Sequence, residues 1–228
     1  MATAPLIERE AAARAFFATP DRYLTGNYRI ARRIELAREM LGSLRGKQLV
    51  DLGAGDGSIA AAIGESAHVT LVDSSASMLA LAPAHHRKVH ADLLSFDGAG
   101  RYDAALCIGV LAHVDDTARV VAALARSLRP GGQALLQFSD CERLLTKLAH
   151  AARAAGGGLR YRQTAGRMIR KLVEQHGLTI IDQRQHLLLL PAMRRLLGRA
   201  LVPFDRFVSR HPDLARFGTD TLLLLSKA

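Results

Sequence analysis

The stretch Leu49-Val-Asp-Leu-Gly-Ala-Gly-Asp-Gly57 decides the fold of this chain, because a short apolar strand runs directly into a glycine-rich turn. Residues 58–64 then open a helix, so the turn joins a strand to a helix. Such a turn invites comparison with the dinucleotide-binding fingerprint, which has glycine at its first, third and sixth positions. Gly53 and Gly55 fill the first two of these positions, but Ser58 stands at the sixth. The turn therefore departs from the dinucleotide pattern.

The charges around the turn also argue against a bound pyrophosphate. Asp51 and Asp56 lie on either side of the turn, and two carboxylates beside a pair of phosphates raise the Coulomb energy. Two further acids follow predicted strands. Asp73 ends the second strand, where a carboxylate can accept both hydrogen bonds of a ribose diol, and Asp92 follows the third. S-adenosylmethionine, with cationic sulfonium and ammonium groups, a ribose, an adenine and no phosphate, fits these acids.

A repeating pattern of strands and helices surrounds the turn. Strands are predicted over 48–52, 69–72, 88–91, 102–108, 133–138, 178–190 and 221–226. Helices are predicted over 6–18, 28–44, 58–64, 77–82, 117–128, 140–155 and 164–176. The sequence Arg129-Pro-Gly-Gly132 is interpreted as the turn after the helix over 117–128. Short apolar strands that alternate with helices predict one α/β domain with a parallel sheet and helices on both faces.

Five motifs in this frame resemble those of class I S-adenosylmethionine-dependent methyltransferases. Residues 49–57 are similar to the first motif of that superfamily, and 71–78 to its second strand and following helix. Residues 91–93 resemble the turn that contacts adenine, 102–115 the fourth strand, and 128–132 the turn after the next helix. The resemblance implies a Rossmann-like, doubly wound, seven-stranded sheet, mostly parallel with a reversed last strand.

The resemblance also implies which residues hold the methionine part of the cofactor. Gly53, Ala54 and Gly55 would pass beneath it, and Asp51 would lie near its ammonium group. Ile108 would lie beneath the sulfonium together with Gly109.

For the nucleoside part of the cofactor, the resemblance implies a second set of residues. Asp73 would hold the ribose, while Ser74 and Met78 would border the adenine. Asp92 and Leu93 would hold the far edge of the adenine. No metal is expected at this site.

A base is needed in methyl transfer only where the nucleophile must lose a proton. His113 follows the fourth strand beside the expected transfer point and is the candidate catalytic residue. A histidine at this turn is frequent in the superfamily, so a capping or packing role is favoured and that of general base remains the alternative.

Residues 1–44 are expected to form a helical lid segment ahead of the methyltransferase domain at 45–228. In this segment Tyr23, Asn27 and Tyr28 are candidates for contact with the cofactor or the acceptor, and Tyr28 is assigned to the cofactor. Apolar residues of the helix over 28–44 form one predicted stripe, which comprises Ile30, Ile34, Ala37 and Leu41. Arg32 and Arg33 fall largely outside that stripe.

A basic amphipathic insertion is expected at about 191–218. Its apolar residues alternate with arginines between 192 and 216, which is typical of a lid that packs on the sheet and keeps its arginines in solvent. The alternative is peripheral contact with an anionic membrane surface.

Composition places loose limits on function. The net charge of +10 follows from 31 Lys and Arg against 21 Asp and Glu, yet net charge alone specifies no partner. The chain has no Trp and only 5% aromatic residues, so a base-stacking platform is poorly supplied and nucleic acid is an unfavoured partner. The start shows no secretory signal and the two cysteines predict no disulfide framework, so a cytoplasmic protein is expected.

These observations predict an enzyme that methylates a small, lipophilic or secondary-metabolite acceptor, with O-methylation favoured. An RNA or protein methyltransferase that uses the basic surface is the first alternative. A non-catalytic module that binds the cofactor or a partner is the second. Oligomeric state does not follow from the sequence.

Overall fold

The computed structural model describes residues 28–155, 163–186, 201–211, 214 and 218–228. The predicted helix over 6–18 lies outside the described residues, as do Tyr23, Asn27 and most of the expected insertion. Of that insertion, the described part is mainly the helix α10 (Leu201–Arg210). In the part of the chain that is described, no helix is long and apolar enough to cross a membrane.

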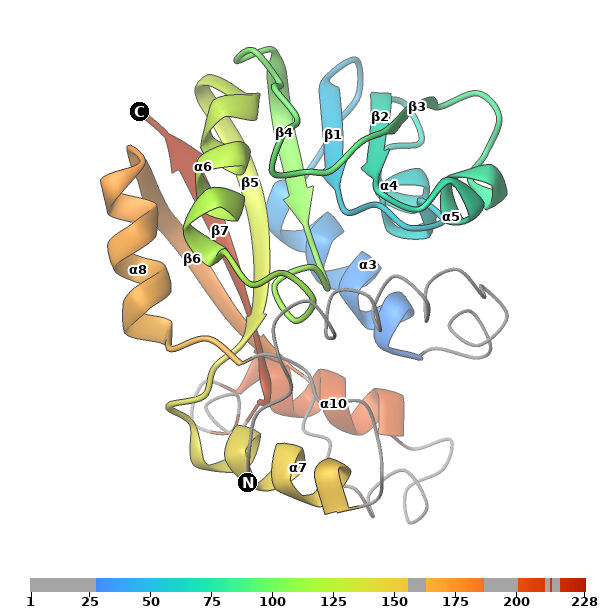
Figure 1. Cartoon of the computed structure of the whole chain (residues 1–228). Helices are drawn as coiled ribbons and strands as arrows, with labels where there is room; N and C mark the ends of the chain where they lie inside the picture. Colours follow the sequence, from blue (N-terminus) through green and yellow to red (C-terminus); the bar gives the residue numbers. More distant parts are fainter. Residues whose placement is uncertain (1–27, 156–162, 187–200, 212–213, 215–217) are drawn as a thin grey trace.

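The described residues form one seven-stranded sheet with the strand order β3-β2-β1-β4-β5-β7-β6 (Figure 1). Its strands are β1 (Gln48–Leu52), β2 (His68–Asp73), β3 (Arg87–His90), β4 (Tyr102–Cys107), β5 (Leu128–Ser139), β6 (Leu178–His186) and β7 (Asp220–Lys227). β7 runs antiparallel to both β5 and β6, whereas the remaining neighbouring pairs are parallel. The expected Rossmann-like sheet with a reversed last strand is confirmed.

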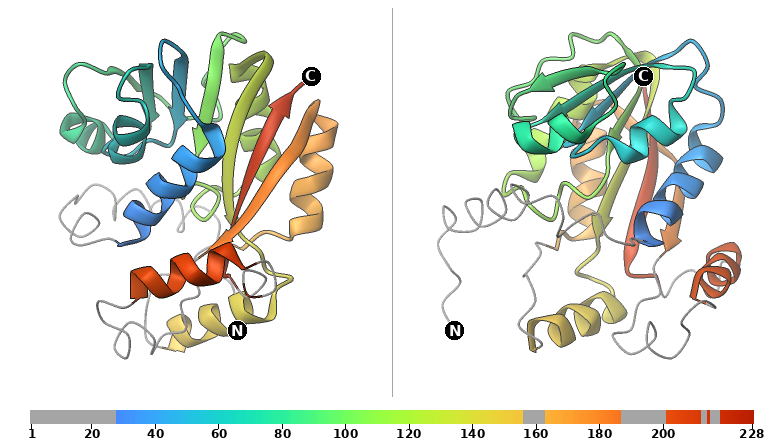
Figure 2. Two further views of the ribbon diagram at one scale, coloured as in Figure 1. Left: turned by 180° about the vertical axis from the view of Figure 1, so that it is seen from behind. Right: turned by 90° about the vertical axis from the view of Figure 1, so that its right-hand side faces the viewer.

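Helices cover both faces of this sheet (Figure 2). On one face pack α3 (Tyr28–Leu41), α4 (Ser58–Ile63) and α5 (Ala76–Leu81), whose buried residues share a core with Leu135 of β5 and Leu222 of β7. On the other face, α6 (Thr117–Ser127) and α8 (Gly166–Gln175) share a second core with the sheet. Beyond the carboxyl ends of β4 and β5 lie α7 (Leu144–Ala155) and α10 (Figure 1).

The order of the strands creates a crevice between β1 and β4. From β1 the chain proceeds outward to β2 and β3, and it then returns to β4 on the other side of β1. The connections after β1 and β4 therefore leave the carboxyl edge in opposite directions. Ligands of open α/β sheets bind at this point.

The structure corrects the predictions made for the ends of two helices. The helix predicted over 28–44 ends at Leu41, because Gly42 adopts a positive φ of 62° and its N–H bonds the carbonyl of Arg38. The helix predicted over 117–128 ends at Ser127, and residues 128–132 are an extended, irregular start of β5 rather than a turn.

The predicted apolar stripe of α3 is also displaced. The buried residues are Leu36, Ala37, Met40 and Leu41, whereas Ile34 is only half-buried. Arg33, expected outside the stripe, is buried with 9% of its surface exposed, as is Arg32 with 3%. The first turns of α3 therefore bury charged residues against the sheet, which an apolar pattern does not reveal.

Candidate active site

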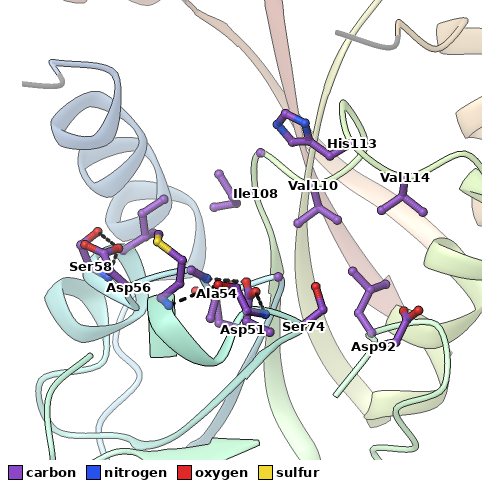
Figure 3. Close-up of a pocket in the computed structure, with 18 of the residues that line it drawn as sticks. Asp51, Ala54, Asp56, Ser58, Ser74, Asp92, Ile108, Val110, His113 and Val114 are labelled. Carbon is purple, nitrogen blue, oxygen red and sulfur yellow. Dashed lines mark hydrogen bonds between the residues drawn. The ribbon is translucent and has the colours of Figure 1, made fainter. Parts of the chain in front are cut away.

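A pocket of about 350 Å³ opens at the carboxyl ends of β1, β2 and β4 (Figure 3). It brings together nearly all of the residues that the sequence predicts for the site. These are Asp51, Gly53, Ala54, Gly55, Asp73, Ser74, Met78, Asp92, Leu93, Ile108, Gly109 and His113. Tyr28 is the exception: it begins α3, and its side chain lies outside what the structure describes.

The glycine turn needs its glycines for two separate reasons. Gly53 and Gly57 have φ values of 77° and 71°, in the left-handed region that L side chains rarely adopt. A Cβ on Gly53 would also overlap Cγ2 of Val110, and a Cβ on Gly57 would lie 2.6 Å from Cδ1 of Leu71. The turn is thus pressed against β2 and the loop after β4, and its backbone is left bare on the pocket side.

Asp73 fastens this turn as well as lining the pocket. Its Oδ2 accepts a hydrogen bond from the N–H of Gly55 at 2.7 Å, and its Oδ1 accepts one from the N–H of Ser75 at 2.8 Å. A carboxylate has about four acceptor sites, so both oxygens retain capacity for the hydroxyls of a ribose. The sequence predicted contact with the cofactor but missed this structural role.

Asp56 and Asp92 both have local partners. Asp56 accepts from the N–H and the hydroxyl of Ser58, the first residue of α4, while Asp92 accepts from the N–H of Leu94. They lie toward opposite ends of the pocket, with Ser74 between them (Figure 3). Each is therefore a turn residue that also faces the pocket.

Asp51 is the most strongly perturbed acid of the site. It is only 5% exposed, at the end of β1. Burial raises the pKa of its carboxyl to about 8, and the nearby carboxylates of Asp73 and Asp56 add to this shift. The carboxylates of Asp73 and Asp56 thus oppose ionisation of Asp51, and a cation bound in the pocket would offset this repulsion.

His113 lies at the other end of the pocket, beyond Ile108 and Val110 (Figure 3). Burial lowers its pKa to about 4, and the guanidinium of Arg33 contributes to the shift. The imidazole is therefore neutral at pH 7. Because general bases work best with a pKa near the operating pH, this environment favours hydrogen bonding or packing over proton abstraction.

Arg33 is the residue at this end that the sequence missed. Its Nη1 lies 3.4 Å from the position that a Cβ on Gly109 would take. The sequence held only a weak signal: Arg33 lies one turn from the apolar residue Ile30, which also lines the pocket, but Arg29 and Arg32 stand beside it in the chain.

A family model described as a methyltransferase domain matches residues 22–183, more than half of the chain. The chain belongs to this methyltransferase family. Its membership confirms the resemblance to class I S-adenosylmethionine-dependent methyltransferases on which the motif assignments rest.

Among curated relatives, the methyltransferase is similar to two proteins named ubiquinone biosynthesis O-methyltransferase. That of Bordetella avium is 34% identical over 110 residues, which cover 44% of this chain and 46% of the relative. That of Alkalilimnicola ehrlichii is 32% identical over 121 residues, which cover 49% of this chain and 48% of the relative. The chain spans about half the length of the curated relatives it matches.

Solved structures show the same fold at low sequence identity. The methyltransferase aligns with 1,6-didemethyltoxoflavin-N1-methyltransferase of Burkholderia thailandensis, solved with its named substrate and S-adenosylhomocysteine, at a TM-score of 0.64 and 19% identity, covering 100% of this chain and 92% of that one. It also aligns with magnesium protoporphyrin IX methyltransferase of Synechocystis PCC 6803, solved with S-adenosylhomocysteine. The TM-score is 0.68 and the sequence identity 19%, and the alignment covers 96% of this chain and 100% of that one.

Proposed function

We propose that this methyltransferase transfers the methyl group of S-adenosylmethionine to an oxygen of a small, lipophilic acceptor. The observation that carries the proposal is the acidic pocket around Asp51, at the crevice between β1 and β4. The names of the curated relatives, both O-methyltransferases, support oxygen as the atom methylated.

The residues present fit this cofactor. Gly53 and Gly55 carry no side chains, which leaves room for an extended ligand along the turn. The buried carboxyl of Asp51 gains a partner when a cation lies beside it. Asp73 is anchored by two backbone N–H groups and so presents fixed acceptors to a diol. Met78 and Leu93, both buried, supply an apolar border suited to an adenine ring.

The acceptor end of the pocket has a different character. Ile108, Val110 and Val114 surround the region below His113, and Ile30 of α3 adds a further apolar side chain (Figure 3). A lipophilic acceptor loses less on leaving water for such a surface than a highly polar one does. We therefore place the acceptor at this end.

The cofactor supplies an electrophilic methyl group on a cationic sulfur. With the cofactor bound, the acceptor oxygen would take this methyl group in place of the sulfur, and the hydroxyl proton would leave to solvent. The chain contributes alignment and exclusion of water, which supply much of the rate in such displacements. Neutral His113 is placed to orient the hydroxyl. Because its pKa is about 4, we do not assign it the role of the base that takes the hydroxyl proton.

The test is a screen of acceptors with the purified full chain and S-adenosylmethionine, read by the release of S-adenosylhomocysteine. The panel pairs catechols with matched anilines and includes bulk RNA and a protein mixture. We expect methyl ethers from the catechols, identified by mass spectrometry. Two variants accompany the screen. Asp73→Ala, in the pocket, is expected to lose turnover, and the control Arg119→Met, on the exposed side of α6, is expected to keep it.

Failure of the chain to bind S-adenosylmethionine would refute the proposal. Methylation of the anilines or of RNA, with the catechols untouched, would refute the choice of acceptor and leave methyl transfer standing. Binding without turnover on every class of acceptor would support a non-catalytic module.

A further inference from the structure

A second group of polar side chains is buried beside the pocket, on the face of the sheet that α3 covers (Figure 2). We call it the Arg33 cluster; it consists of Arg33 of α3, Gln137 and Ser139 of β5, His186 of β6 and Asp220 of β7. Ser139 and His186 are both register partners of Asp220, so the strand ends bring these side chains together.

Hydrogen bonds inside the cluster converge on Asp220. Its Oδ2 accepts from Nε2 of Gln137 at 2.8 Å, and its Oδ1 accepts from the hydroxyl of Ser139 at 2.7 Å. Nη2 of Arg33 stays 3.8 Å from Oδ2. The aspartate is therefore held by its strand neighbours, and its ion pair with Arg33 is long rather than a close, bidentate pair.

Several polar atoms of the cluster have no hydrogen-bond partner within the described structure. They are Nε of Arg33, Oε1 of Gln137 and both ring nitrogens of His186. Arg33, Gln137 and His186 are 9%, 4% and 1% exposed. Buried polar groups without a hydrogen-bond partner are rare in folded proteins, so four in one cluster indicate a ligand that satisfies them.

The cluster adjoins the acceptor end of the pocket. Nη1 of Arg33 lies 3.4 Å from the Cβ position of Gly109, and the charge of Arg33 is felt at His113; both of these residues line the pocket. Asp220 is three strands away from β1, roughly 14 Å at the usual spacing between strands. The cluster thus extends away from the glycine turn, on the side where the acceptor is proposed to bind.

Charged side chains surround His186 within the cluster. It lies in the field of Arg33, Arg32 and Arg29 and of the carboxylate of Asp220. Arg32 is itself paired with Glu35 at 2.9 Å. Burial and these arginines lower the pKa of His186 to about 4, so it adds a neutral imidazole rather than a further charge. Arg33, whose carboxylate partner stays 3.8 Å away, is therefore the cation of the cluster with capacity for an anionic ligand.

We propose that the Arg33 cluster is the acceptor-binding end of the active site and that Arg33 binds an anionic oxygen of the acceptor, a carboxylate or an ionised hydroxyl. This inference rests on the proposed function and narrows its substrate class to acidic lipophilic molecules. The guanidinium provides parallel N–H donors that match a carboxylate, and a ring N–H of His186 supplies a further donor. Oε1 of Gln137 is an acceptor, so it would bind a hydroxyl or N–H of the acceptor molecule rather than its anionic oxygen. The competing anion is the carboxylate of the cofactor itself.

The test measures binding rather than turnover. The full chain is saturated with S-adenosylhomocysteine and titrated with benzoate and with benzamide, which match in shape and differ in charge. We expect benzoate to bind at least tenfold more tightly than benzamide. Arg33→Met should abolish this preference while the Kd for S-adenosylhomocysteine stays within twofold, and Arg119→Met, a matched loss of charge on exposed α6, should change neither.

Two further variants guard against misfolding of Arg33→Met. Arg33→Lys keeps the charge and should keep part of the preference, and Asp220→Asn removes the competing carboxylate and should increase it. Equal binding of benzoate and benzamide to the unaltered chain would overturn the inference. So would a tenfold weaker affinity of Arg33→Met for S-adenosylhomocysteine, which would assign Arg33 to the cofactor. If the unaltered chain did not bind S-adenosylhomocysteine, the proposed function would fail, and this inference with it.

Discussion

Binding of the cofactor is expected to release a proton, and Asp51 is the residue that releases it. The carboxyl is 5% exposed, and burial with two neighbouring carboxylates raises its pKa to about 8. In the free protein at pH 6.5 it is therefore mostly protonated. A cationic ammonium group beside it favours the ionised form and lowers its pKa. Proton release follows from this difference between the free and bound states.

The magnitude follows from the same pKa. At pH 6.5 a carboxyl with a pKa of about 8 is roughly 97% protonated. An α-amino group titrates near 7.7–8.0, so at this pH the amino group of the ligand is already charged and contributes little. We expect roughly 0.9 proton released per molecule bound at pH 6.5, and an affinity that rises nearly tenfold per pH unit between about pH 6 and 6.5. The rise becomes shallower above about pH 7, where the amino group of the free ligand begins to lose its own proton.

Isothermal titration calorimetry at pH 6.5 in two buffers of different ionisation enthalpy gives the number of protons released. The matched variant is Asp51→Asn, which has the same size and cannot ionise, and its proton release should fall close to zero. The matched ligand is 5′-methylthioadenosine, which lacks the amino acid part and should release no proton. Release near zero from the unaltered chain, or equal release from Asp51→Asn, would refute the reasoning.

Three further substitutions test the pocket. Gly53→Ala should lower the thermal unfolding temperature more than Gly42→Ala, because both have positive φ but only Gly53 faces Val110; equal shifts would contradict the close approach. Asp73→Ala should weaken S-adenosylmethionine binding at least tenfold and lower the unfolding temperature, since it frees two backbone N–H groups; unchanged affinity in calorimetry would exclude the ribose role. His113→Ala should reduce kcat several-fold without abolishing it, and complete loss at unchanged binding would make it the general base.

The glycine turn and its acids are predictable from sequence because the relevant signals are local. Asp51 and Asp73 each end a short apolar strand, and parallel strands present their carboxyl ends at one edge. The close contact of Gly53 with Val110 is not local, because it joins the loops after β1 and β4. The hydrogen bond from Gly55 to Asp73 likewise depends on how β1 and β2 pair.

The Arg33 cluster is not predictable from sequence patterns, because it too depends on contacts between distant parts of the chain. Its members come from one helix and three strands that are far apart in the chain, and none belongs to a motif. A charged residue in a helix is expected in solvent, so the apolar pattern of α3 predicts a buried face that excludes Arg33. Only the pairing of β5, β7 and β6 brings Asp220 and His186 beneath it.

The two ends of the site complement each other in charge. The acids around Asp51 favour a cation, whereas Arg33 favours an anion, and the pocket extends from Asp51 to Gly109, beside which Arg33 lies. Methyl transfer would remove the positive charge of the cofactor sulfur, and in a site shielded from water such a change interacts strongly with fixed charges. Asp220 moderates Arg33 without closing a tight pair with it, since Nη2 of Arg33 stays 3.8 Å from Oδ2. The guanidinium is therefore tolerated near a cationic cofactor and still available to an acidic acceptor.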